Sequence, residues 1–173
     1  METDHQRCSL GKPAALLERR YRGGTGGRVT WSGDGTKWFG GDDGGWVSDD
    51  LFGNGADVNV VIFANGIFVV GGSQGGVKTS TDGKAWSEYI DGKFGSAGVW
   101  GIAYGNGVFF AVGDNGKMSE STNGSTWKAI QTGVGGSQFN DDERIADITT
   151  NGENFVIIGN KYDGNQSKVA YSF

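Results

Sequence analysis

Three Asn-Gly dipeptides recur along this chain of 173 residues, and each is followed by an apolar stretch that ends in glycine. They begin at Asn65, Asn106 and Asn151, so successive copies lie 41 and 45 residues apart. Asn-Gly favours the tip of a tight β-hairpin, and self-similarity at this period is typical of β-propeller blades. The repeat therefore predicts an array of similar β units, while saying little about what such an array binds.

The second repeat shows the unit most clearly. It divides into four short β-prone segments, at residues 99–104, 108–112, 117–121 and 127–130, separated by Asn-Gly dipeptides. Because Asn-Gly accepts the positive φ values of a hairpin turn, this order predicts a four-stranded antiparallel meander. Four short strands in one such repeat is the size of a propeller blade.

The whole pattern predicts an all-β, propeller-like repeat domain over residues 29–173, with about three to three and a half blades. We expect a partial blade at 29–40, complete blades at 58–90 and 99–131, and an incomplete blade at 145–173 that lacks its outer strand. The partial blade would contribute only two outer strands, at 29–32 and 36–39.

A set of three blades is too few to close a ring, because propellers typically have four to eight. The sequence therefore predicts either part of a larger propeller or self-association that completes the propeller. In the second case, the strand at 36–39 of one chain would follow the strand at 169–172 of another.

Residues 1–28 differ from the rest of the chain because they carry six basic residues against three acidic ones. Pro13 could begin a helix over residues 14–22, and Gly23 with Gly24 would end it. We expect a short leader that is helical or disordered, either an extension or a segment that docks on a partner.

Several functional classes are excluded by what the remainder of the chain lacks. The only histidine, His5, and the only cysteine, Cys8, both lie in the leader, so we expect no disulfide, no metal site and no cofactor. The rest of the chain carries about −8 of charge, which disfavours nucleic acid as a partner. No apolar run is long enough to span a membrane, and no signal peptide is visible, although a virion or extracellular location is favoured by the function considered below.

A second motif, Ser-x-Asx-Gly-x-x-Trp, also occurs three times. In such a turn the Asx side chain accepts backbone N–H groups, glycine adopts a left-handed conformation and tryptophan packs beside the hairpin. We therefore expect its residues to be structural: Ser32, Asp34, Trp38, Ser80, Asp82, Trp86, Ser121, Asn123 and Trp127.

This motif resembles the Asp-box of BNR-type repeats, whose pattern is roughly S-x-D-x-G-x-x-W and which is found in sialidases and in many non-enzymatic propellers. Each copy here is one residue shorter than that pattern, and in one copy Asn123 also replaces the aspartate. The shortened motif, together with Asn-Gly strands such as residues 106–113, is also similar to repeats in bacteriophage tail and receptor-binding proteins and in bacterial surface proteins. The resemblance covers residues 29–173 and implies a repeat architecture more specifically than it implies a role.

Aromatic and acidic residues in the loops between blades are the candidates for ligand binding. The spacing between Trp38 and Trp86 is 48 residues rather than 41, which places an insertion between them. Loops of this kind often carry specificity, and a ring beside carboxylates suits a sugar. The candidates are Trp46, Asp49, Asp50, Phe52, Phe139, Asp141 and Asp142, whereas Trp100 is expected to pack in the core. The acidic pairs lack the spacing of a calcium loop, so we expect solvated loops there.

A sialidase-like reaction would need a cluster of arginines, and Arg144 is the only arginine after Arg28. We therefore expect no catalytic residues. The sequence favours a non-enzymatic structural or receptor-binding module, a component of a phage virion or tail that binds surface glycan or a virion protein. The alternatives are a fragment of a divergent, sialidase-like glycosidase, and an assembly factor that binds a protein partner, similar to the Asp-box propellers of photosystem biogenesis.

Overall fold

The computed structural model describes residues 5–7, 14–18, 27–32, 50–53, 55–131, 138–164 and 166–172. In this part of the chain the regular elements are strands, apart from one 3-10 turn, η1 (Asp114–Gly116).

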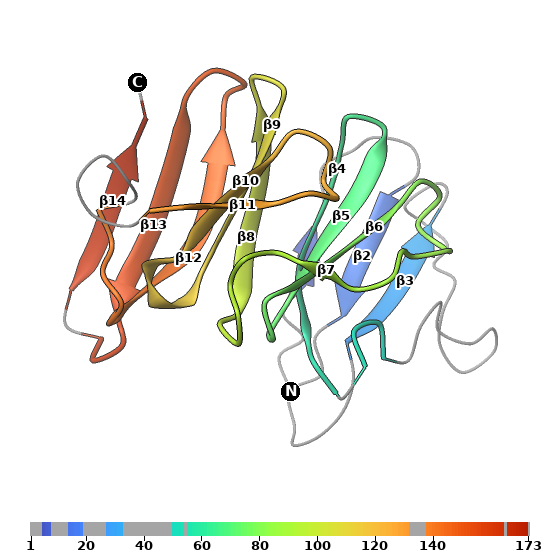
Figure 1. The fold of residues 1–173 in the computed structure, drawn as a ribbon, viewed down its shortest axis with the longest axis horizontal. Helices are drawn as coiled ribbons and strands as arrows, with labels where there is room; N and C mark the ends of the chain where they lie inside the picture. Colours follow the sequence, from blue (N-terminus) through green and yellow to red (C-terminus); the bar gives the residue numbers. More distant parts are fainter. Residues whose placement is uncertain are drawn as a thin grey trace.

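The strands form four antiparallel sheets in chain order (Figure 1). The first sheet contains β1 (His5–Arg7), β2 (Ala14–Glu18) and β3 (Arg28–Ser32), and the second contains β4 (Val58–Ala64), β5 (Ile67–Gly72), β6 (Gly76–Ser80) and β7 (Ile90–Asp91). The third contains β8 (Val99–Gly105), β9 (Val108–Gly113), β10 (Met118–Ser121) and β11 (Lys128–Ile130), and the fourth contains β12 (Glu143–Thr150), β13 (Phe155–Lys161) and β14 (Ser167–Tyr171).

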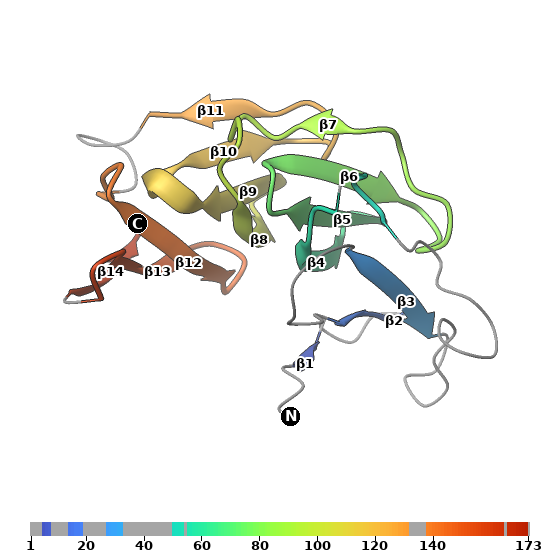
Figure 2. The ribbon, with the colours of Figure 1, turned by 90° about the horizontal axis from the view of Figure 1, so that it is seen from below.

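The four sheets fan out in an open arc, with the first and the fourth at its two ends (Figure 2). The first strands of the later sheets, β4, β8 and β12, lie on the concave side, and β7 and β11 lie on the convex side. Neighbouring sheets pack face to face. The predicted all-β, propeller-like array of four-stranded antiparallel blades is confirmed.

The last three sheets share one register. The inner hairpin of each contains a glycine at one equivalent position: Gly72 pairs with Val58, and Gly113 pairs with Val99. Gly159 pairs with Ile145 in the same way, and an irregularity of one residue follows at this point in all three sheets. Because the register is the same, a residue in one sheet has a defined equivalent in the next.

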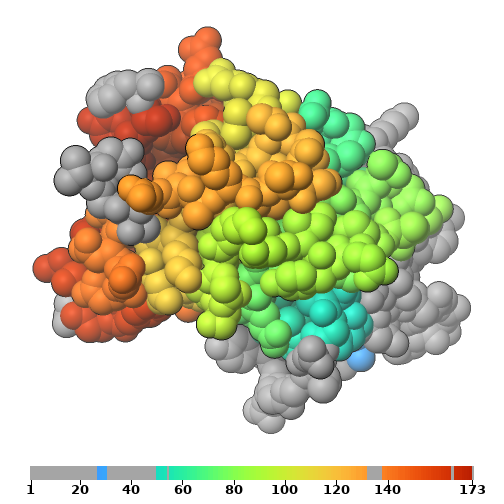
Figure 3. Space-filling model, viewed as in Figure 1, coloured from blue at the N-terminus to red at the C-terminus, as the bar shows by residue number. Residues whose placement is uncertain are grey.

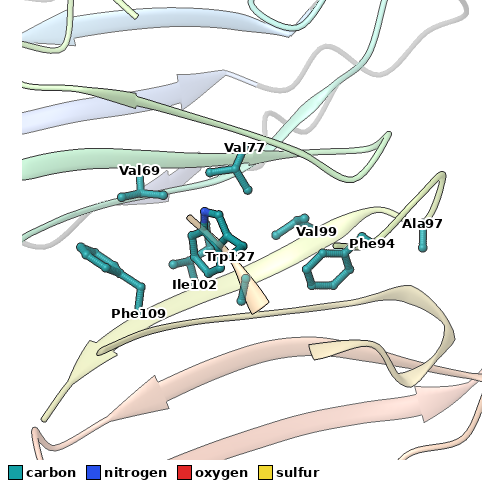
Figure 4. Packing of buried hydrophobic residues seen from close by; sticks show 9 residues of the cluster. Val69, Val77, Phe94, Ala97, Val99, Ile102, Phe109 and Trp127 are labelled. Carbon is teal, nitrogen blue, oxygen red and sulfur yellow. The ribbon is translucent and has the colours of Figure 1, made fainter. Parts of the chain in front are cut away.

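The apolar core lies between the sheets. Val69 and Val77 of the second sheet pack with Ile102, Phe109 and Trp127 of the third (Figure 4). A second cluster joins the third sheet to the fourth, and a third cluster joins the first sheet to the second. Each inner sheet therefore buries both of its faces, as its nearly continuous apolar strands predict.

The three Asn-Gly turns are not equivalent. Asn65 and Asn106 have φ of 50° and 51° in two-residue turns, the geometry that Asn-Gly favours. Between β12 and β13, however, Thr150 pairs with Phe155, so the loop has four residues. The carboxamide Oδ1 of Asn151 there accepts the backbone N–H of Asn154 at 2.8 Å. The loop adds no residues to the repeat, because Val99 and Gly113 correspond to Ile145 and Gly159 at the same offset, so the extra residues of the third repeat lie before β12.

The predicted leader helix is wrong where the structure describes it. Residues 14–18 form β2, which pairs with β3 over its whole length, and β1 adds a third strand. A helix of about nine residues is marginal alone, whereas the backbone of β3 offers a ladder of hydrogen bonds to an apolar neighbour. The first blade therefore begins within the predicted leader, and the predicted strand at 36–39 lies outside the described residues.

Candidate functional site

The Ser-x-Asx-Gly turns of the second and third sheets share one set of hydrogen bonds. The Oδ1 atom of Asp82 accepts the backbone N–H groups of Lys84 and Ala85 at 2.8 and 2.9 Å. The Oγ atom of Ser80 accepts the N–H of Gly83 at 2.9 Å. The backbone hydrogen bond from Lys84 is the main reason that the pKa of Asp82 lies below its ordinary value.

Asn123 replaces the aspartate in the third sheet without changing the turn. Its Oδ1 atom accepts the N–H groups of Ser125 and Thr126 at 2.9 and 2.8 Å, and Ser121 Oγ accepts that of Gly124 at 2.8 Å. Since the carbonyl oxygen of an amide performs the same task as the carboxylate, a charge is not needed here. Of the first copy, the side chain of Ser32 and residues Asp34 and Trp38 lie outside the described part of the chain.

The tryptophans of this motif pack toward the preceding sheet. Trp127 is buried, and its Nε1 donates to the carbonyl oxygen of Gly124 at 2.9 Å. Trp86 is half-buried and packs against the core cluster between the first and second sheets, with its ring centroid 6.5 Å from that of Phe68 in its own sheet. In the space-filling view the outer segment of the third sheet, drawn in orange, lies against the green outer segment of the second (Figure 3). Each tryptophan therefore joins two neighbouring sheets.

The ligand candidates in the insertion are partly accounted for by packing. Phe52 is half-buried and joins the core cluster between the first and second sheets, with its ring against Gly72. The carboxylate of Asp50 accepts the N–H of Gly55 at 3.1 Å, which closes a turn. Trp46 and Asp49 lie outside the described residues.

The remaining ligand candidates precede β12 in the fourth sheet. Phe139 is fully buried in the cluster between the third and fourth sheets, so the prediction that its ring faces a ligand is wrong. Asp141 and Asp142 are exposed, and Asp142 lies 3.5 Å from the ammonium group of Lys161. The third sheet separates these residues from Phe52, so the structure does not bring the two groups of candidates together.

A polar cluster that the sequence did not predict joins the third and fourth sheets around Asp114. Arg144 Nε donates to Asp114 Oδ1 at 2.7 Å, and the hydroxyl of Tyr162 lies 3.1 Å from the same oxygen. The guanidinium carbon of Arg144 lies 4.2 Å from the ring centroid of Trp100. Burial opposes ionisation of Asp114, but hydrogen bonds from Trp100 and Arg144 outweigh it and lower its pKa.

The same surroundings act in the opposite direction on Tyr162. Burial is the main cause that raises the pKa of its phenol, and the charge of Asp114 adds to it. Arg144 is paired with Asp114 and stacked on Trp100, so its main role is to join two sheets, and its charge is not available to an anionic ligand.

The sequence carried one signal for this cluster, which is the position of its residues along the strands. Trp100 and Arg144 lie at the starts of β8 and β12, whereas Asp114 and Tyr162 directly follow β9 and β13.

A buried ion pair holds the start of β12. Glu143 is fully buried, and Lys168 of β14 approaches its Oε1 atom at 2.6 Å. The other oxygen accepts the N–H of Asn140 at 2.8 Å. Burial opposes ionisation of Glu143, but the hydrogen bond from Lys168 outweighs it, so the pKa of this carboxyl lies below its ordinary value. This pair fixes β14 to β12 across β13.

The fourth sheet exposes an apolar face, which points away from the third sheet. Val156 and Ile158 of β13 are 37% and 47% exposed, and Val169 and Tyr171 of β14 are 67% and 64% exposed. Val156 pairs with Tyr171, and Ile158 pairs with Val169, so the four side chains form one patch. We call these four residues the terminal face.

The equivalent positions of the inner sheets are covered. In the third sheet, Phe110, Val112 and Met118 correspond to Val156, Ile158 and Val169, and they pack against the fourth sheet. In the second sheet, the positions of Val156 and Val169 are taken by Val69 and Val77, which are fully buried. The terminal face therefore has the composition of a blade interface.

Two hollows lie among the described residues. An open one of about 420 Å³ is lined by Lys93, Lys117 and Asp141, among others. A more apolar one of about 380 Å³ lies between the third and fourth sheets. Within the described residues there is no group of three or more His, Cys, Asp or Glu side chains placed to hold a metal ion. In the same residues there is no helix long and apolar enough to cross a membrane.

Comparison with solved structures places the arrangement among propellers. The computationally designed Ika4 protein is 14% identical with a TM-score of 0.56, and the match covers 100% of this chain and 94% of that one. The designed Ika8 protein is 15% identical with a TM-score of 0.56, over 96% of this chain and 45% of that one.

A structure from the GH130 family is also similar, in a study of glycoside hydrolases that target β-1,2 mannosidic linkages in Candida mannan. It is 16% identical with a TM-score of 0.54, over 92% of this chain and 60% of that one. At these identities the likeness concerns the fold alone. A comparison with curated proteins finds no match.

A comparison with family models identifies one family. The model described as the DUF6242 beta propeller domain matches residues 45–172, which include the last three sheets and the insertion before them. This chain therefore belongs to the DUF6242 beta propeller domain family.

Proposed function

We propose that the chain is a non-enzymatic binding module that works as an assembled ring. In this proposal the terminal face of one copy packs on the first sheet of a second copy. The observation that supports it is the exposure of Val156, Ile158 and Val169 at positions whose equivalents form the interfaces between the inner sheets.

A second copy is the occupant that fits this face best. The first and fourth sheets lie at the two ends of one arc, so two arcs placed end to end would close a ring with twofold symmetry (Figure 2). Four sheets in each chain would give eight blades, which is within the range of propellers. Burying one Val or Ile side chain stabilises by about 1.5–3 kcal/mol, so three such residues at each of two junctions supply a substantial gain.

The pairing of β3 bears on how the two copies would join. The sequence suggested that the strand at 36–39 of one chain pairs with the last strand of another. However, β3 pairs with β2 in its own sheet, and only residues 33–35 separate it from that segment. We therefore expect residues 36–39 to stay with the first sheet, and we place the contact at the faces of the sheets.

A double substitution tests the assembly. Wild-type protein is expected to sediment as a dimer at micromolar concentration, and I158K/V169K as a monomer, because two buried lysines without partners would cost more than the contact gains. The matched control is Tyr89→Lys, which changes an aromatic residue that is 53% exposed and lies outside the terminal face. A monomeric wild type, or a double variant that remains dimeric, would contradict the proposal.

The ligand of the ring belongs to the same proposal. We propose surface glycan, with a role as a structural or receptor-binding component of a phage particle, on the basis of the resemblance to Asp-box repeats and the aromatic and acidic insertion. The pairing of Arg144 with Asp114 supports a non-enzymatic role, because an arginine cluster for a sialoside carboxylate would need free guanidinium groups.

A glycan array tests this ligand class. We expect wild-type protein to bind at least one surface polysaccharide, and Trp46→Ala to reduce that binding about tenfold or more, since an aromatic platform contributes much of the affinity for a sugar. Phe139→Leu serves as a control, because this buried ring is not expected to contact the ligand. Hydrolysis of sialosides or polysaccharides would favour the glycosidase alternative, and capture of a protein partner without glycan binding would favour an assembly factor.

A further inference from the structure

The apolar cavity between the third and fourth sheets has a volume of about 380 Å³. Phe110, Met118 and Ile130 line it from the third sheet. The equivalent positions of the second sheet are Val69, Val77 and Ile90, as the strand pairings show. Those three residues belong to the cluster that surrounds Trp127.

The wall on the fourth sheet repeats the correspondence. Ile148, Phe155 and Ile157 line the cavity, and their equivalents in the third sheet are Ile102, Phe109 and Ala111. These residues also belong to the cluster around Trp127, which Figure 4 shows between the two sheets. The cavity is therefore lined by the counterparts of the residues that hold Trp127.

The side chain that fills this position in the third sheet has no counterpart in the described part of the fourth. Trp127 follows the Ser-x-Asx-Gly turn after β10 and leads into β11, which pairs with β10. In the described residues β14, the equivalent of β10, is the outermost strand of the fourth sheet and pairs with β13. The cavity and the outer edge of β14 thus lie where a fourth strand with its tryptophan would be.

We propose that this cavity binds a tryptophan side chain, carried by an extended peptide segment of another polypeptide that pairs with the outer edge of β14. Addition of a strand to a sheet edge supplies backbone hydrogen bonds, and a side-chain pocket supplies specificity. A half-open apolar cavity with a sheet on each side favours a large planar ring.

Trp127 also indicates which peptides fit. Its Nε1 donates to the carbonyl oxygen of Gly124, three residues earlier, so the apolar walls do not have to satisfy the indole. Gly124 itself lies over the second sheet, where an added Cβ would be 2.9 Å from Ile67. We therefore expect the partner segment to carry glycine three residues before its tryptophan.

The probe is a labelled peptide with the sequence of residues 121–131, titrated into the 173-residue chain and followed by fluorescence anisotropy. We expect saturable binding, and binding weaker by about tenfold or more when alanine replaces the tryptophan of the peptide. A peptide with alanine in place of the glycine should also bind more weakly. No binding, or equal binding of the tryptophan and alanine peptides, would overturn the proposal.

Two protein variants locate the binding. Ala170 lines the cavity, and its equivalent Ser119 is fully buried beside the occupied position. Ala170→Phe is expected to abolish peptide binding without lowering the Tm, because the new ring enters the cavity. Ser119→Phe has no such space and should lower the Tm by about 4 °C or more, since overpacking strains a filled core. Peptide binding that survives Ala170→Phe, or a fall in Tm as large as that of Ser119→Phe, would contradict the site.

This site shares Tyr171 with the proposed ring contact but otherwise lies on the opposite face of the fourth sheet. Ile157 and Ala170 face the third sheet, whereas the terminal face points away from it. The I158K/V169K protein is therefore expected to bind the peptide as well as wild type does. If this protein loses the dimer and still binds the peptide, the peptide site stands. If wild-type protein dimerises but does not bind the peptide, the peptide site is refuted and the ring proposal is unaffected.

Discussion

Trp127→Ala is expected to lower the free energy of unfolding by about 3–5 kcal/mol, the usual range when a large buried aromatic side chain is truncated. The ring is 3% exposed and belongs to a cluster with residues of the second and third sheets. Its loss would leave a cavity between two sheets and remove the hydrogen bond to Gly124. Chemical denaturation followed by circular dichroism measures the change.

Two controls separate packing from other effects. Trp127→Phe keeps most of the apolar contact and should cost less than half as much. Tyr89→Ala removes an aromatic side chain that is 53% exposed and should change stability by about 0.5 kcal/mol or less. A cost for Trp127→Ala close to that for Tyr89→Ala would mean that the ring does not hold the sheets together.

Gly113→Ala is expected to cost about 3 kcal/mol or more, because overpacking against rigid backbone cannot relax easily. Gly113 has an extended backbone with φ of −171°, so the reason is steric and not conformational. A Cβ atom there would overlap the carbonyl oxygen of Gly98 and lie 2.9 Å from the ring of Phe94. The amide of Asp114 donates to that same carbonyl at 3.0 Å, which fixes it in place.

The matched control is Gly107→Ala in the hairpin between β8 and β9. Gly107 has φ of +78° and open space around it, so alanine would meet only the left-handed penalty of about 1–2 kcal/mol. Thermal or chemical unfolding of the two variants compares them directly. If Gly113→Ala proved the milder of the two, the close approach of the two backbone segments would be refuted.

The sequence was sufficient to predict the repeating unit, because the signals for strands and turns are local. Asn106-Gly107 and the apolar run at residues 108–112 determine a hairpin through contacts between neighbours. The strand at 14–18 could not be predicted in this way, since Leu16 and Leu17 suit a helix locally and become a strand through pairing with β3. The four-residue loop at Asn151 was not predicted, because Asn-Gly begins both this loop and the two-residue turns at Asn65 and Asn106.

Much of the candidate site could not be predicted for a different reason. The turns around Asp82 and Asn123 follow from spacing within seven residues and were predicted correctly as structural hydrogen-bonded turns. Phe139 looked like a loop aromatic, but its burial depends on a neighbouring sheet. The cluster around Asp114 brings to it Arg144 and Tyr162, which lie 30 and 48 positions later, and only the packing of two sheets determines this.

The core clusters between the sheets have a consequence for how such chains can change over evolution. When one repeat is duplicated within a gene, the new copy brings a matching face for each of its two interfaces, because each sheet presents one face to each neighbour. The duplicated sheet can therefore pack on its neighbours without new apolar substitutions. Blade number in this family can therefore change by whole units, and selection can act on loops such as the one at Asn151 without disturbing the shared faces.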